Sequence, residues 1–155
     1  MCGKEFAEKG RVKRQSDIDR LQDEVQGLID DLWHVPRFAR GRRGFRPLVD
    51  CIRSEEPAAL HVVVELPGVD PKSIQVVLAD RMLVVAGERR PPLKGRYQQM
   101  EIEYGPFLRR IPLDEPVDPE NATAQYDKGM LTVDLPVAAR PARVERVAIV
   151  IRGRG

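Results

Sequence analysis

Residues 124–136 read Ala-Gln-Tyr-Asp-Lys-Gly-Met-Leu-Thr-Val-Asp-Leu-Pro, and the fold we expect is built outward from this stretch. Asp127-Lys128-Gly129 has the composition of a tight turn, because glycine takes a positive φ at little steric cost. After the turn, apolar and polar residues alternate, which separates them onto the two faces of a strand. The aliphatic set is Leu131, Val133 and Leu135. Pro136 ends the strand, so the stretch predicts a β-hairpin with one aliphatic face.

Short apolar runs recur from Leu48 onward, and turn residues separate them. Strand signals lie in residues 60–66, 74–78, 82–87 and 107–113, and the hairpin of residues 121–135 completes the set. No helical pattern lies between these runs. Strands spaced in this way predict an all-β domain, an immunoglobulin-like antiparallel β-sandwich over residues 48–137.

Residues 1–47 are interpreted as an N-terminal arm. The first 15 residues are polar and show no regular spacing of apolar residues, which predicts disorder. Apolar residues then follow at spacings of three and four, which predicts an amphipathic helix over about residues 17–34. Its stripe comprises Ile18, Leu21, Val25, Leu28, Leu32 and Trp33. Such a helix is marginal alone, so the stripe either docks on its own domain or serves self-association or contact with another protein.

Residues 36–47 hold five arginines and two phenylalanines but no acidic residue. Arginine interleaved with aromatic residues is one pattern of single-strand nucleic-acid binding. It equally fits a flexible linker broken by Gly and Pro. We favour the linker, because neither an aromatic-studded sheet nor a basic domain follows it.

Residues 138–155 form an extended C-terminal tail. Pro141 disfavours both a helix and the hydrogen bonding of a β-sheet at its position. An apolar patch over residues 144–151 follows within otherwise basic sequence. The patch is either a last strand of the same domain or a detachable strand that docks on the edge of another chain. Residues 1–48 carry 11 Lys/Arg and 8 Asp/Glu, residues 49–137 carry 10 and 15, and residues 138–155 carry 5 and 1. The acidic middle therefore permits attraction to both basic arms.

Residues suited to catalysis, metal binding or phosphate binding are few in this sequence. His34 and His61 are the only histidines, and no Ser/His/Asp grouping, Cys/His grouping or phosphate-binding glycine loop is recognisable. Cys2 and Cys51 are too few for a disulfide framework or a zinc site. No signal peptide is recognisable, and no apolar run approaches the roughly 20 residues of a membrane span. We therefore predict a cytoplasmic protein without catalytic site, metal or cofactor.

Four short motifs stand in order along the chain. They are Glu65-Leu66-Pro67-Gly68-Val69-Asp70, Gly105-Pro106-Phe107-Leu108-Arg109, Ala124 with Gly129 and Leu131, and Ile149-Val150-Ile151. Together they resemble the small heat-shock proteins of the α-crystallin family over about residues 49–151. The resemblance implies an ATP-independent chaperone, a holdase that binds partly unfolded client proteins and prevents their aggregation under stress.

The resemblance also implies an assembly. In the family the C-terminal I-x-I motif, here Ile149, Val150 and Ile151, fills a groove between two edge strands of a neighbouring subunit. The corresponding groove residues are Ile74, Val76, Leu78, Ala122 and Ala124. We therefore expect a homo-oligomer held by repeated, individually reversible contacts.

A dimer is the expected building block, because family members with a long loop here swap a strand from it onto the partner's sheet. The loop is residues 88–100, and the candidate contacts are Arg96, Tyr97, Gln98, Gln99, Met100 and Arg109. For clients, the candidates are the apolar stripe of the arm together with Phe38 and Phe45.

Three positions depart from the family pattern. Lys128 stands where Asn or Asp is common, so we expect a less strongly pinned turn. Ala122 replaces a larger aliphatic residue, so we expect a wider groove, and Asp114 follows Leu113 where Pro is usual. Two other functions stay open. One is a co-chaperone or adaptor on the same sandwich that serves a dedicated partner. The other is an Arg-rich binder of nucleic acid or membrane surfaces that acts through residues 36–47 and the tail.

Overall fold

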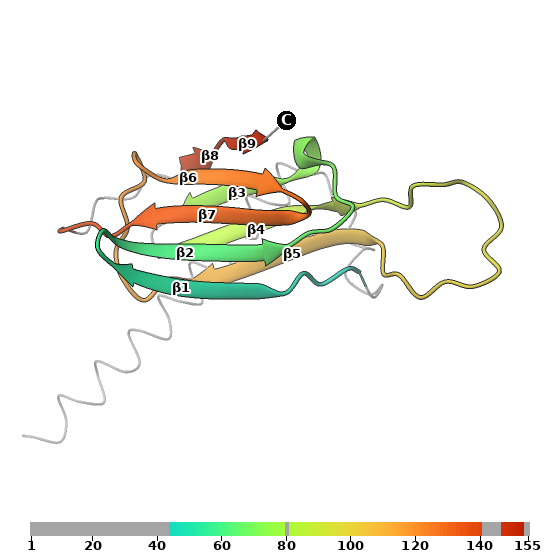
Figure 1. The fold of residues 1–155 in the computed structure, drawn as a ribbon, viewed down its shortest axis with the longest axis horizontal. Helices are drawn as coiled ribbons and strands as arrows, with labels where there is room; N and C mark the ends of the chain where they lie inside the picture. Colours follow the sequence, from blue (N-terminus) through green and yellow to red (C-terminus); the bar gives the residue numbers. More distant parts are fainter. Residues whose placement is uncertain (1–43, 80, 141–146, 154–155) are drawn as a thin grey trace, which may run out of the picture. The chain divides into compact units, whose positions relative to one another are not determined.

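The computed structural model describes residues 44–79, 81–140 and 147–153, which all belong to one of the two units of the chain, residues 42–155. These residues form two stacked β-sheets (Figure 1). One sheet has the strand order β1-β2-β7-β6-β9 and the other the order β5-β4-β3-β8. The all-β sandwich that the sequence predicted is confirmed. The predicted helix over residues 17–34 lies outside the described residues.

The strands are β1 (Val49–Glu55), β2 (Ala58–Glu65), β3 (Gln75–Ala79), β4 (Met82–Arg89), β5 (Gly105–Pro112), β6 (Thr123–Asp127), β7 (Met130–Pro136), β8 (Val147–Ile149) and β9 (Ile151–Gly153). A short 3-10 helix, η2 (Pro71–Ser73), precedes β3 and is capped by the carboxylate of Asp70. The pairs β1–β2, β2–β7, β6–β7, β3–β4 and β4–β5 are all antiparallel.

The β6–β7 hairpin has the tight turn that the sequence predicted. Asp127 pairs with Met130, and the two residues between them both have positive φ, 48° at Lys128 and 79° at Gly129. This is the two-residue geometry that matches the twist of paired strands. A Cβ on Gly129 would lie 3.0 Å from Cα of Pro67, so the position requires glycine for space as well as for its φ.

The core lies between the sheets. Along β7 every second side chain is fully buried, as the alternation predicted, and β2 opposite it shows the same pattern. The largest fully buried aliphatic residues are Leu66, Leu78, Leu83, Leu131 and Leu135. Burial of side chains of this size contributes about 1.5–3 kcal/mol each, and both sheets supply them.

β1 is the strand that the sequence pattern did not single out. Its residues are exposed or half-buried on both faces, so they show no apolar alternation. The predicted strand through Leu113 ends one residue earlier at Pro112, and the Leu113 N–H donates to the Arg81 carbonyl at 2.7 Å.

Candidate interaction sites

The I-x-I segment docks as two short strands, one on each sheet. β8 pairs antiparallel with β3 and sets Ile149 opposite Val76, while β9 pairs parallel with β6 and sets Ile151 opposite Ala124. Val150 belongs to neither strand and is 81% exposed, whereas Ile149 is only 8% exposed. The segment therefore crosses from one sheet to the other and inserts an isoleucine at each, along the side of the sandwich where β3 and β6 lie (Figure 1).

The five residues predicted to line the groove lie along its two walls. On the β3 wall they are Ile74, Val76 and Leu78, all buried. On the β6 wall Ala124 is buried, and Ala122 is partly buried and packs against the core. Ile151 of the docked tail is partly buried too and packs against the same core. Because alanine methyls fill little of the space between the sheets, this wall leaves room for the Ile151 side chain.

The structure seats this tail on the groove of its own chain. The family resemblance implied the groove of a neighbouring subunit, and the sequence had left a last strand of the same domain open as well. Residues 147–153 occupy in one chain the position that a neighbour's tail would take. The groove can therefore be filled from within the chain.

Tyr126 positions the β6 wall, and no sequence pattern had predicted this role. Its hydroxyl lies 2.8 Å from the Leu66 carbonyl oxygen and 3.0 Å from that of Val69. Burial raises the pKa of Tyr126 above its usual value, so the hydroxyl keeps the proton that it donates. Leu66 N–H in turn donates to the Gly129 carbonyl at 2.7 Å. The hairpin is thus fixed to residues 66–69, in the stretch that carried the first family motif.

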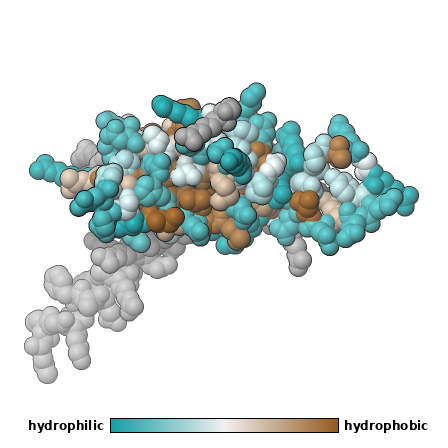
Figure 2. All heavy atoms as spheres, in the orientation of Figure 1, coloured by the Kyte–Doolittle hydropathy of each residue, from teal (hydrophilic) through white to brown (hydrophobic). Residues whose placement is uncertain are grey.

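Residues 90–104 project from the sandwich as a loop between β4 and β5 (Figure 1). The predicted dimer contacts Arg96–Met100 all lie in it, exposed and outside any strand. Its exposed large hydrophobic residues are Leu93, Tyr97, Met100 and Ile102. Figure 2 shows hydrophobic side chains among hydrophilic ones on this projection. A loop that presents four such side chains to water offers a contact surface for another protein.

Arg109, the other predicted dimer contact, lies on β5 and is partly buried. Its guanidinium donates to the carbonyl oxygen of Pro47. Burial lowers the pKa of Arg109, and the neighbouring charge of Arg46 lowers it further. A Cβ on Gly44 would lie 2.6 Å from the Pro106 carbonyl oxygen. Residues 44–47 therefore run beside β5 and cover it.

Phe45 packs on the sandwich. Its ring meets that of Phe107 edge-on, with centroids 5.8 Å apart and planes at 86°, and the Arg89 guanidinium lies 4.6 Å from its centroid. Phe45 was predicted to contact clients, and it would have to leave this packing to do so. The other predicted client contacts, Phe38 and the stripe of the arm, lie outside the described residues.

Three side chains on the outer face of the five-stranded sheet form a hydrogen-bonded chain. Oγ of Ser54 lies 2.9 Å from Nε2 of His61, and Nδ1 of His61 lies 2.6 Å from Oδ1 of Asp134. The sequence had led us to expect no Ser/His/Asp grouping, and this expectation was wrong. The residues are distant in sequence, and only the strand register brings them together, since His61 pairs directly with Asp134.

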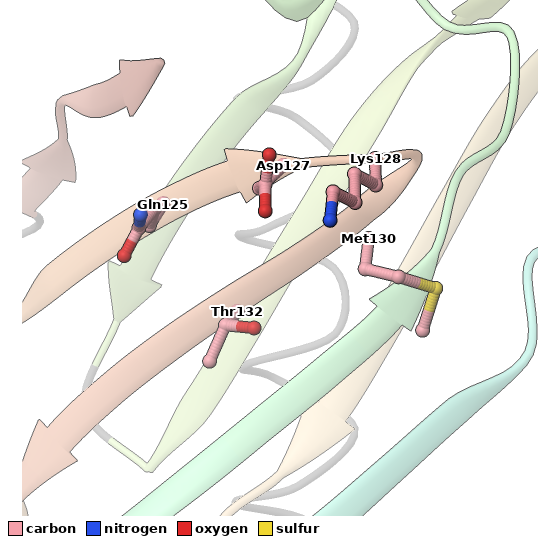
Figure 3. Close-up of a pocket in the computed structure, with 5 residues that line it drawn as sticks. All are labelled: Gln125, Asp127, Lys128, Met130 and Thr132. Atoms are coloured by element: carbon pink, nitrogen blue, oxygen red, sulfur yellow. The ribbon is translucent and has the colours of Figure 1, made fainter. Parts of the chain in front are cut away.

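No metal site is recognisable in the part of the chain that the structure describes, where no group of three or more His, Cys, Asp or Glu side chains could hold an ion. A depression of about 330 Å³ lies at the β6–β7 hairpin. It is lined by Gln125, Asp127, Lys128, Met130 and Thr132 (Figure 3). Its lining is polar except for Met130 and holds neither a nucleophile–base pair nor a metal-binding set.

The sandwich is that of a known family. The model of the Hsp20/alpha crystallin family matches residues 52–151. The chain is 34% identical over 151 residues to a 19.0 kDa class II heat shock protein of Oryza sativa subsp. japonica, covering 90% of this chain and 85% of that protein. It is 38% identical over 85 residues to an 18 kDa heat shock protein of Streptomyces albus G, covering 53% of this chain and 59% of that protein.

Among solved structures, hspA from Xanthomonas axonopodis superposes with a TM-score of 0.54 at 31% identity, over 63% of this chain and 97% of that one. The chain therefore belongs to the Hsp20/alpha crystallin family. It is a small heat-shock protein with an α-crystallin domain, and membership of this family of chaperones, which are not enzymes, supports a chaperone role. No helix among the described residues is both long enough and apolar enough to cross a membrane.

Proposed function

We propose that this protein is an ATP-independent holdase in the cytoplasm, which binds partly unfolded client proteins under stress and prevents their aggregation without a cofactor. The observation that carries the proposal is the I-x-I segment seated across the edges of both sheets. A contact of this kind can be exchanged between chains, because it consists of short strand pairings and two isoleucine side chains rather than of the core.

The energetics favour exchange. Burial of each isoleucine contributes at most about 1.5–3 kcal/mol, and Ile151 is only partly buried. Ordering the tail offsets part of this, which leaves an affinity near the millimolar range for one tail. Such contacts hold an assembly only when several act together. We therefore propose a homo-oligomer in which tails exchange between their own groove and that of a neighbour.

The oligomer is tested by light scattering after size exclusion, on the full chain and on a variant truncated after Arg143. Truncation should yield smaller assemblies, because the groove loses its occupant. Val150→Ala is the matched control, since this side chain points into solvent and its loss should leave the mass unchanged. An unchanged oligomer after truncation would refute the proposal that the tail holds it.

For the dimer beneath this assembly, we propose that the loop of residues 90–104 lies on β1 of a second copy. Among the described residues β1 ends the five-stranded sheet without a strand on its other side, whereas β5, which ends the other sheet, is covered by residues 44–47. The exposed apolar residues of the loop would be buried there, and main-chain groups would pair with the open edge.

For clients, we propose the arm with its apolar stripe as the main contact. Heat-induced aggregation of a model client, followed by light scattering without ATP, tests holdase activity directly. Removing residues 1–43 should abolish suppression and keep Phe45 in its packing on Phe107. Suppression that survives this truncation would place client binding on the sandwich instead, and no suppression by the full chain would overturn the holdase proposal.

A further inference from the structure

We propose that Ser54 is an activated nucleophile and a site of covalent acylation by activated esters or thioesters. The proposal rests on the Ser54–His61–Asp134 chain and is independent of the chaperone function. Both distances, 2.9 Å from Oγ to Nε2 and 2.6 Å from Nδ1 to Oδ1, are within hydrogen-bonding reach. This is the arrangement in which a histidine acts as base for a serine and a carboxylate orients the histidine.

The carboxylate sets the tautomer. A carboxylate only accepts hydrogen bonds, so a neutral imidazole in this position would donate Nδ1–H to Asp134 and present Nε2 as an acceptor to Ser54. The strands hold this geometry, because His61 and Asp134 face each other across the β2–β7 ladder and Ser54 lies on the neighbouring β1. The His61 and Asp134 side chains are 34% and 48% exposed, so a small reagent can reach the cluster.

The step balances without any further reactant. The Ser54 oxygen attacks the carbonyl carbon of the ester or thioester, and its proton passes to Nε2 of His61. The bond from that carbon to the leaving oxygen or sulfur then breaks, and the leaving alcohol or thiol takes the proton. The products are acyl-Ser54 and a free alcohol or thiol, with the Ser54–His61–Asp134 charges restored.

The groups around Ser54 favour a stable acyl-serine over repeated cycles of acylation and hydrolysis. The Ser54 hydroxyl donates to the Pro57 carbonyl oxygen at 2.9 Å and lies 3.4 Å from that of Ala59. Its single proton must therefore rotate from Pro57 toward Nε2 of His61 before the attack. The two carbonyl groups are acceptors, whereas a developing oxyanion needs donors. Water at this half-exposed site has to stabilise the oxyanion, so attack on a good acyl donor proceeds and hydrolysis of the stable acyl-serine is slow. Ile52, 52% exposed and on the same face of β1, offers an apolar contact for the acyl group.

Ser73 provides an internal comparison. Its hydroxyl also lies beside two carbonyl oxygens, at 2.8 Å from Asp70 and 3.4 Å from Glu88, but no histidine of the described residues is hydrogen-bonded to it. Positioned general bases contribute typically about 10²–10⁴-fold to a rate. Ser54 should therefore be acylated at least about 100-fold faster than Ser73 in the same folded chain.

The test treats the full chain with p-nitrophenyl acetate and measures acetylation of each peptide by mass spectrometry over time. Acetyl should accumulate on Ser54 to about one equivalent. His61→Gln should bring its rate to that of Ser73, and Asp134→Asn should lower it at least about 10-fold by allowing the wrong tautomer. Ser73→Ala should leave Ser54 acetylation unchanged.

Equal rates at Ser54 and Ser73, or a Ser54 rate unaffected by His61→Gln, would overturn the proposal. Circular dichroism establishes that each variant keeps its β-sandwich. If His61→Gln does not fold, the ratio of the two serines in the unmodified chain decides alone.

Discussion

The two sides of the sandwich are closed in different ways. On one side, β3 and β6 are covered by β8 and β9 from the chain's own tail. On the other, residues 44–47 cover β5, while no strand of the described ranges pairs with the outer edge of β1, and the loop of residues 90–104 exposes hydrophobic side chains. One chain thus covers its own β3/β6 edge, whereas the β1 edge is available to a second chain within the part that the structure describes.

Deletion of residues 91–99 should have the largest effect, because it removes the loop that we propose for the open β1 side. The hairpin from β4 to β5 can still close through the remaining loop residues. The mass of the smallest stable unit, measured by light scattering at low concentration, should fall from dimer to monomer. A dimer that persists would show that the loop is not the dimer contact.

Replacing both isoleucines of the tail tests the covered side. Ile149→Ala with Ile151→Ala should weaken docking by about 3 kcal/mol, since each change removes three carbons at about 0.8 kcal/mol per buried CH₂ and Ile151 is only partly buried. Hydrogen exchange at the amides of β3 and β8 should become at least about 100-fold faster. Val150→Ala should change nothing, because that side chain is 81% exposed. Equal exchange in the two variants would contradict a docking carried by the isoleucines.

The turn at the end of the β6 wall should give effects of about 1 kcal/mol. Lys128 has φ of 48°, a conformation that Asn adopts more readily, so Lys128→Asn should raise the free energy of unfolding by about 0.5–1 kcal/mol. Gly129→Ala should lower it by at least about 1 kcal/mol, because a Cβ there lies 3.0 Å from Cα of Pro67. Urea unfolding measures both, and the same sign for the two variants would contradict this account of the turn.

The smallest expected effect is the loss of stability at acidic pH that comes from the Arg53–Glu115 ion pair at the β1 edge. Nε of Arg53 on β1 lies 2.7 Å from Oε2 of Glu115, and this hydrogen bond holds the pKa of Glu115 below its usual value of 4.5. Because the pKa of Glu115 is lower in the folded than in the unfolded state, its ionised carboxylate stabilises the fold fully above about pH 4.5. This stabilisation is lost as the pH falls through the folded-state pKa. Both side chains are 35% exposed, so the effect is small.

Urea midpoints at pH 7 and pH 3 test this expectation. Glu115→Gln should lower the midpoint slightly at pH 7 and by less at pH 3, because the contribution of the carboxylate declines as the pH falls below 4.5. Glu101→Gln in the projecting loop is the control and should have no effect at either pH. A midpoint difference that is the same at both pH values would refute a role of the Glu115 charge.

Much of the fold could be predicted from local sequence. Alternation alone identified the buried face of β7, because the side-chain period of a strand is two, and Asp127-Lys128-Gly129 identified the hairpin turn. β1 was not predicted, because an edge strand exposed on both faces shows no regular alternation of apolar residues. Of the candidate sites, the sequence motifs identified the groove and the I-x-I tail, but their docking within one chain could not be read from spacing.

What the sequence by itself determined, then, are the elements whose signals lie within a few residues: the strands with one buried face, the turn at Gly129 and the I-x-I motif. Only the tertiary structure decided which distant residues meet. Ser54, His61 and Asp134 form a hydrogen-bonded chain because β1, β2 and β7 lie side by side in one register. Register and strand order depend on core packing between segments far apart in the chain, and a one-residue shift would send each of these side chains to the opposite face.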